Sequence, residues 1–264
     1  MLWNAKFYHH FSGFESILPV WHQIESHFIN SMPSPEDYNR HFPNQFNHFI
    51  CQKEALDYEK KVVEERSIPT RLNNWHDFFN NLTWLSFPLI KQALVERSVN
   101  IRQNKLGTTQ RSPQQSLLAH FDECGMLLCS TDSSYFDLVK SFSWKLLFQE
   151  NQLLNHVFPL VVGHGLMEKA LKPYIGMTAK VIFVHVKPDF INFSLEKKIR
   201  LLDNKISTYI MSQQLPHSPQ SLCPFPLLGW PNWFDLQDDN FYNNTGYFRL
   251  ERRLKVKLAC YAEC

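Results

Sequence analysis

Apolar residues at three- and four-residue steps recur along most of this chain, whereas only one segment has the composition of a buried strand. The apolar spacing is plain in residues 1–30 and in the long segment 194–215, and the charged segment 52–66 has Glu/Lys pairs at helical spacing. The strand-like segment 177–186, MTAKVIFVHV, is short and rich in β-branched residues. We therefore predict an α+β fold that is mostly helical and contains a small antiparallel sheet.

Four other segments carry turn or loop signals. Segment 116–132, SLLAHFDECGMLLCSTD, has two apolar runs around Asp-Glu-Cys-Gly, which predicts a β-hairpin with Gly125 at positive φ. The polar residues 100–115 predict a loop, and whether it is a lid or a simple connection stays open. The proline-rich residues 216–235 predict an extended segment, and the tail 246–261 a last strand. Because no repeat or linker divides the chain, we predict a single domain over residues 1–264.

The charge balance of the chain indicates which classes of partner it is expected to bind. The chain has 27 basic and 25 acidic residues, a formal charge of +2, so it has no general electrostatic reason to bind nucleic acid or an anionic membrane. We expect a small-molecule substrate instead. A weaker alternative is RNA contact through a basic run near the end of the chain, which consists of Arg249, Arg252, Arg253, Lys255 and Lys257.

The cysteines and the apolar segments indicate in which cellular compartment the protein is expected. The six cysteines are scattered, without CxxC or zinc-finger spacing, in a chain whose 44% hydrophobic residues suffice for a core. Residues 1–21 lack the basic and continuous apolar regions of a signal peptide, and no apolar run approaches the ~20 residues of a membrane span. We therefore expect a cytoplasmic protein with reduced thiols.

The segment 70–94, TRLNNWHDFFNNLTWLSFPLIKQAL, concentrates amides, an imidazole and a carboxylate at the start of a predicted helix. His76 and Asn80 lie one turn apart on one face, and Asp77 lies on the adjacent face. An imidazole beside a carboxylate and amides can act as a general base or supply metal ligands. Asn73 or Asn74 can equally cap the helix, with His76 as a satisfied core residue. Both interpretations remain open.

Two shorter motifs carry carboxylates or a second histidine. In GHGLMEKAL, His164 and Glu168 are an i,i+4 pair, a spacing typical of half a metal site. A helix start with Gly163 as cap explains the same residues without a site. Asp122 and Glu123 could bind a cation, although the hairpin turn predicted there also favours an Asp.

The chain lacks the motifs of two common enzyme classes. No glycine-rich phosphate loop and no GxSxG motif is present, which argues against nucleotide-binding folds and serine hydrolases. An aromatic group in the proline-rich region can line an apolar pocket, or simply pack: Trp230, Trp233, Phe241 and Tyr242.

Four blocks occur together in this order: the Asn/His block at 70–94, LLAHFDECGMLL, VVGHGLMEKALKPYIGMTAK, and PFPLLGWPNW with DDNFYNNTGYFR. In this combination the chain, from about residue 15 to 250, resembles a bacterial family of uncharacterised proteins, domain-of-unknown-function family 3025. The family pattern maps onto Arg71 through Asn80, Phe121 through Gly125 and Gly163 through Glu168, while Trp230 and Asn232 depart from it. The resemblance implies relatives and no activity.

The leading hypothesis is a hydrolase in which His76, Asp77, His164 and Glu168 are catalytic. His76, His164 and Glu168 would hold a divalent metal, the cofactor that these residue types suggest. We expect a second group to contact the substrate: Asn74, Asn80, Asp122, Glu123, Trp233 and Tyr242. The alternative is a non-catalytic module that binds a small molecule or a protein through the Trp/Pro-rich segment 223–242.

Overall fold

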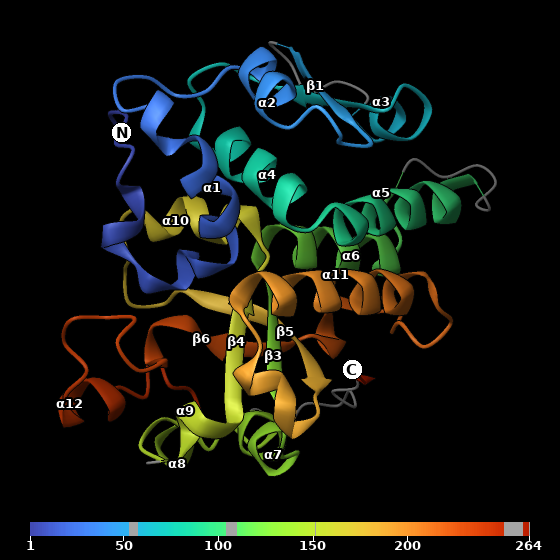
Figure 1. The fold of residues 1–264 in the computed structure, drawn as a ribbon. Helices are drawn as coiled ribbons and strands as arrows, with labels where there is room; N and C mark the ends of the chain where they lie inside the picture. The colour runs from blue at the N-terminus through green and yellow to red at the C-terminus, as the bar shows by residue number, and fades with distance from the viewer. Residues whose placement is uncertain (53–57, 104–109, 151, 251–260, 264) are drawn as a thin grey trace.

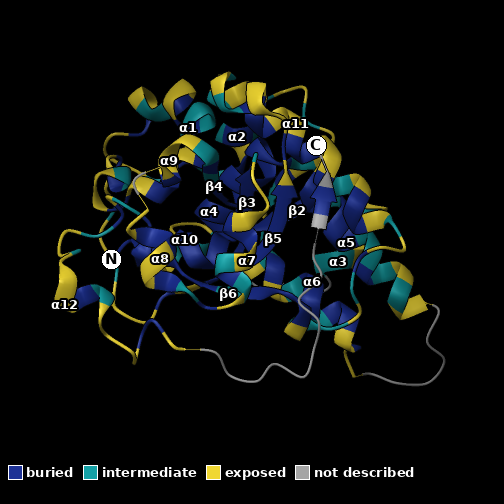
Figure 2. Ribbon diagram, turned by 90° about the horizontal axis from the view of Figure 1, so that it is seen from below, coloured by how far each residue is buried: buried dark blue, intermediate teal, exposed yellow. Residues whose placement is uncertain are grey.

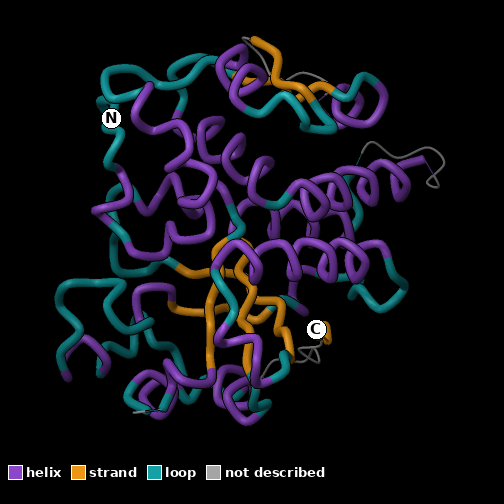
Figure 3. Tube along the Cα trace, viewed as in Figure 1, coloured by secondary structure: helices purple, strands orange, loops and turns teal. Residues whose placement is uncertain are grey.

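The computed structural model describes residues 1–52, 58–103, 110–150, 152–250 and 261–263. Helices dominate it, as the periodicity predicted, and they surround a central sheet (Figures 1 and 3). Their bounds are α1 Leu18–Ile24, α2 Pro35–His41, α3 Tyr58–Glu64, α4 Trp75–Ser86, α5 Pro88–Gln103, α6 Pro113–Cys124, α7 Ser134–Lys140, α8 Trp144–Phe148, α9 Leu153–His156, α10 His164–Ala170, α11 Leu195–Met211 and α12 Asp239–Tyr242. The α+β class is confirmed.

The strands form a small pair and a larger sheet. β1 (His48–Cys51) and β2 (Ser67–Thr70) pair in parallel. The larger sheet has the order β4-β3-β5-β6, with β7 also paired to β5. Its strands are β3 Gly125–Ser130, β4 Val157–Val161, β5 Thr178–His185, β6 Cys223–Pro226 and β7 Tyr261–Glu263.

The pairing within the larger sheet is mixed. The expected antiparallel pairs are present, β3 with β4 and β5 with β6. The central pair, β3 with β5, runs parallel, and so do β5 and β7. A parallel pair needs a long crossover. Here the chain between β3 and β5 forms α7 to α9, β4 and α10, which is ample length for that crossover.

Two hydrophobic clusters cover the two faces of this sheet. Along β3, Met126 and Leu128 pack with the N-terminal helices, α4 and α10, whereas Leu127 and Cys129 pack with α5, α6 and α11. This alternation follows from the two-residue period of a strand. Figure 2 shows the strands of the larger sheet as mostly buried and the outer faces of the helices as exposed. No helix in the described ranges is both long and apolar enough to cross a lipid bilayer.

The predicted hairpin over 116–132 is wrong: the first half of that segment is helix α6 and only the second half is strand β3. Ser112 and Gln115 form a capping box, and Pro113 occupies the first helical turn, so the helix starts with strong signals. Gly125 has φ −70° and makes no turn. Asp122 and Glu123 therefore lie in the last turn of a helix.

Of the other local predictions, some are confirmed and some concern segments that lie partly outside the described residues. β5 confirms the strand at 177–186, and α11 confirms the helix at 194–215. The predicted loop 100–115 is helical at both ends, because α5 runs to Gln103 and α6 starts at Pro113, and residues 104–109 lie outside the described residues. Most of the basic run near the end of the chain, at 251–260, also lies outside them.

Candidate functional site

Helix α4 starts from a tightly organised loop. Asn73 has φ +53°, a left-handed conformation that asparagine tolerates better than most residues. Asn74 is the N-cap, and its side-chain oxygen accepts a hydrogen bond of 3.0 Å from the Asp77 N–H. The Asp77 carboxylate accepts from the Arg71 backbone N–H at 2.6 Å and pairs with the Arg71 guanidinium at 2.8 Å. Asn74 and Asp77 therefore build the helix start.

The next turn of α4 carries the polar residues that face inward. Asn81 is fully buried and accepts a hydrogen bond from the Thr70 hydroxyl at 3.2 Å. Asn80 is buried too, and its amide donates weakly to the Tyr58 hydroxyl at 3.4 Å. The side-chain oxygen of Asn80 has no hydrogen-bond partner within the described part of the chain. Asn80 thus keeps a free acceptor one turn from His76.

Helix α10 approaches the end of α6 closely because two glycines flank His164. A methyl group on Gly163 would overlap the backbone of Cys124 and Gly125, and one on Gly165 would overlap the Glu123 carboxylate. His164, at the first position of α10, is consequently held beside Glu123. The glycines thus explain how residues from β4–α10 and α6 come within side-chain reach.

Three side chains from three helices converge at this point. The Nε2 atoms of His76 and His164 lie 3.1 Å apart, and Glu123 Oε1 lies 3.8 Å from the first and 3.7 Å from the second. In a tetrahedral zinc site with bonds of 2.0–2.1 Å, adjacent ligand atoms are about 3.3 Å apart. His76, Glu123 and His164 form a group that could hold one metal ion.

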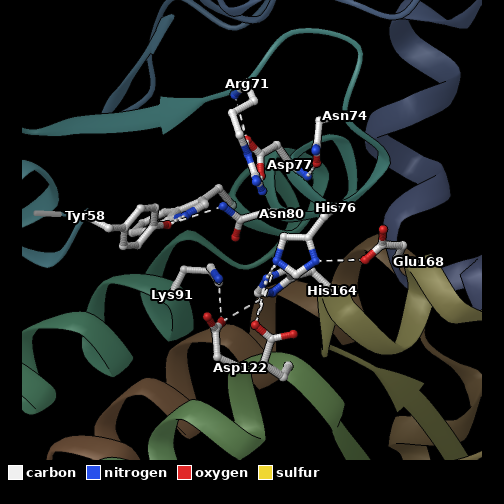
Figure 4. A network of polar contacts seen from close by, with 12 residues as sticks. Tyr58, Arg71, Asn74, His76, Asp77, Asn80, Lys91, Asp122, His164 and Glu168 are labelled. Carbon is white, nitrogen blue, oxygen red and sulfur yellow. Dashed lines mark hydrogen bonds and ion pairs between the residues drawn. The ribbon is translucent and has the colours of Figure 1, made fainter. Parts of the chain in front are cut away.

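The far nitrogen of each histidine faces a carboxylate (Figure 4). His76 Nδ1 donates to Glu168 at 2.9 Å. His164 Nδ1 lies 3.8 Å from the Asp122 carboxylate, which forms an ion pair with Lys91, a residue that is only 1% exposed. A carboxylate that accepts from the outer nitrogen orients the ring of a metal-binding histidine, as Glu168 does for His76. His164 Nδ1, by contrast, is buried and has no hydrogen-bond partner in the described part of the chain. The arrangement leaves both Nε2 atoms pointing at the common centre.

Burial and charge set the protonation of these groups. Burial, followed by the charge of Lys91, lowers the pKa of His164 to about 3, so its imidazole is neutral at neutral pH. Burial acts to raise the pKa of Asp122, but the charge of Lys91 and its hydrogen bond to the carboxylate contribute to a net lowering of that pKa. Burial raises the pKa of Glu123, although the nearby His76 opposes this. A neutral imidazole is the form that binds metal.

The remaining predicted site residues lie elsewhere. Trp233 is buried with its ring 5.0 Å from Phe11, and the Tyr242 hydroxyl donates to the Gly229 carbonyl at 3.1 Å. Both residues pack within the body of the protein around segment 223–242. Lys91 was missed by the sequence reasoning, since a lysine in a helix is ordinarily exposed.

The fold and the cluster together define an α+β protein with a histidine–carboxylate centre built on α4, α6 and α10. The family model described as "Protein of unknown function (DUF3025)" matches residues 47–252, so the chain belongs to this family. The matched region contains all three converging residues. Neither the curated proteins nor the solved structures contain a match to the chain.

Proposed function

We propose that the protein is a metal-dependent hydrolase whose divalent ion is bound by His76, His164 and Glu123. The observation that supports this most strongly is the convergence of His76 Nε2, His164 Nε2 and Glu123 Oε1 within 4.8 Å of one another. Two imidazoles and one carboxylate are a ligand set of catalytic zinc sites, which keep a fourth position for water. Glu168, the ligand expected from sequence, contacts the outer nitrogen of His76 and takes an orienting role.

The electrostatics of the two rings support a cation at the centre. With Nδ1 of His76 donating to Glu168, the neutral ring presents a lone pair at Nε2. If the proton of the neutral His164 ring is likewise on Nδ1, which faces the Asp122 carboxylate at 3.8 Å, two lone pairs face each other at 3.1 Å beside a carboxylate. A shared proton or a bound cation relieves this repulsion. A divalent ion relieves the repulsion between the two lone pairs and can also be bound by the Glu123 carboxylate.

The reaction class follows from what such an ion supplies. A divalent ion of this kind lowers the pKa of a bound water to about 7, which provides a nucleophile at neutral pH. In hydrolysis of an amide or ester, the water oxygen bonds to the carbonyl carbon, the C–N or C–O bond breaks, and the leaving atom takes a proton. We assign Asn80 to substrate orientation, since its side-chain oxygen, although buried, has no hydrogen-bond partner among the described residues. A small-molecule substrate in the cytoplasm is part of the same proposal.

The binding-module alternative has less support. It needs exposed aromatic rings on segment 223–242 as a contact surface. Trp230 is 5% exposed and Trp233 is 7% exposed, so both belong to the core. The polar cluster is the more promising place for chemistry.

Elemental analysis after incubation with zinc and desalting tests the metal site. We expect close to one zinc per chain in the wild type, and loss of zinc in a His76→Ala, His164→Ala double variant that keeps its fold. His120→Ala, which removes an exposed histidine of α6, is the matched control and should retain the metal. Equal, sub-stoichiometric zinc in all three proteins would contradict the site. Ester and amide substrate screens with and without chelator then test turnover.

A further inference from the structure

A cavity of about 430 Å³ lies beside the candidate metal centre, between α3, α5 and α6. Asp122 and Glu123 are part of its wall, so the cavity reaches one of the three proposed ligands. Its size falls in the range of small-molecule sites, about 300–1,000 Å³. The composition of its wall therefore bears on which molecule the centre would act upon.

The cavity wall changes from charged to apolar and back to charged along α5 and α6. α5 and α6 pack as an antiparallel pair, because Lys91 pairs with Asp122 and the Gln115 amide donates to the Ser98 carbonyl at 3.2 Å. The same register places the apolar side chains together in the middle of the cavity wall: Leu94, Val95, Leu118 and Ala119. Farther along α5 and before the start of α6, the same register brings Arg102 and Arg111 to the end of the cavity opposite Glu123.

The two ends of the cavity are well separated. At a rise of 1.5 Å per residue, α6 extends about 15 Å from Pro113 to Glu123. Arg111 precedes this helix and Glu123 is in its last turn. A linear molecule could therefore contact the metal centre with one end and the arginines with the other.

The charges at the arginine end are not balanced. Arg102 pairs with Glu59 at 2.6 Å, and the Glu59 carboxylate also accepts from the Ser98 hydroxyl at 2.9 Å. Lys60 lies 4.0 Å from Glu64. Arg111 is exposed, and within the described part of the chain it has neither a hydrogen bond nor an ion pair. Its guanidinium is left to bind an anionic group, which it can do with two parallel hydrogen bonds.

We propose that the substrate is a linear small molecule with a hydrolysable carbonyl group at one end, an apolar middle and an anionic group at the other end. The carbonyl lies at the His76–Glu123–His164 centre, the apolar part contacts α5 and α6, and the anionic group binds Arg111 beside Arg102. This inference rests on the proposed function, because it assigns the carbonyl end to the metal. Arg111 is then a specificity-determining residue.

The test uses two chelating probes on the full-length, zinc-loaded protein. The first is the monohydroxamic acid of suberic acid, which has a metal-binding hydroxamate and a terminal carboxylate. The second is its methyl ester, which has the same length without the charge. Calorimetric titration should show that the acid binds the wild type about tenfold more tightly than the ester. Arg111→Gln should reduce this ratio to about one and leave the ester affinity unchanged.

Matched variants and separate zinc titrations distinguish the outcomes. Arg97→Gln, whose guanidinium donates to the Met211 carbonyl outside the cavity, should keep the tenfold preference. Equal binding of both probes by the wild type overturns the anionic-substrate inference and leaves the metal site intact. Zinc binding without binding of either probe overturns the link between the cavity and the centre. Failure to bind zinc overturns the proposed function itself, and the inference with it.

Discussion

Gly165→Ala is expected to remove one metal ligand without replacing any ligand residue. A methyl group at position 165 would overlap Oε2 of Glu123, and it would also lie 3.2 Å from the Glu123 carbonyl oxygen and 3.3 Å from Cδ. The carboxylate sits at the end of a flexible side chain, so it can rotate away from the centre. Changes around metal sites typically cost 10–100-fold in affinity, and displacement of a ligand lies at the upper end. We expect zinc to bind about 100-fold more weakly, which is about 2.8 kcal/mol.

The fold itself should tolerate this substitution. Alanine in place of glycine within a helix contributes up to about 1 kcal/mol of stability, which offsets the tight contact with the Glu123 carbonyl. The melting temperature of the metal-free variant should therefore stay within about 4 °C of the wild type. A competition titration against a chromogenic zinc chelator measures the affinity, with Lys172→Ala, just beyond α10, as control. Unchanged zinc affinity in Gly165→Ala would refute the placement of Glu123 among the ligands.

Three other predictions test the surroundings of the centre. Asp122→Asn should weaken zinc binding about 10–100-fold, measured by the same titration, because it removes the negative charge 3.8 Å from His164 Nδ1 and leaves the buried charge of Lys91 without its ion pair. Asp77→Ala should lower the free energy of unfolding by about 2 kcal/mol in urea titrations and leave zinc affinity unchanged, since its carboxylate is bonded to Arg71. Burial raises the pKa of Asp203 to about 6 from 3.8, although the N–H groups at the start of α5 oppose this. The folded state therefore holds this proton more tightly than the unfolded state, and stability falls as pH rises from about 4 to 6, by about 3 kcal/mol from this residue. Asp203→Asn should remove that part of the pH dependence in denaturation measured between pH 4 and 8; an identical slope in both proteins would contradict it.

Local signals made part of the site predictable. The cap at Asn74 and the first-turn Asp77 follow from the rules for helix starts, and the structure has that cap. The sequence grouped His76 with His164 in one metal-site hypothesis, and in the structure their Nε2 atoms lie 3.1 Å apart. Nothing in a local pattern fixes this distance, because it depends on how α10 packs against α4, whereas Gly163 and Gly165 set the approach of α10 to the end of α6.

The surroundings of Glu123 were predicted wrongly because the segment around it was interpreted as a hairpin turn and is the end of a helix. The sequence Asp-Glu-Cys-Gly has the composition of a turn, yet Leu117, Leu118 and Phe121 have helical spacing and extend α6 to Cys124. A turn would have presented Asp122 and Glu123 to solvent as a pair. At the end of a helix the two side chains diverge: Asp122 faces Lys91 and the outer nitrogen of His164, and Glu123 faces the inner nitrogens.

That divergence gives two adjacent carboxylates different chemical roles. Asp122 is bound to a buried ammonium group that keeps its pKa low, so it stays ionised and places a negative charge 3.8 Å from His164 Nδ1. Glu123 is 48% exposed at its side chain, borders the cavity and has a raised pKa, so it can exchange a proton for a metal ion as the centre fills. The end of one helix thus supplies both a proposed ligand and a negative charge beside the histidine partner of that ligand. The same helix forms the wall that leads from the centre to Arg111, and this joins the chemistry of the site to the shape of the molecule we expect it to bind.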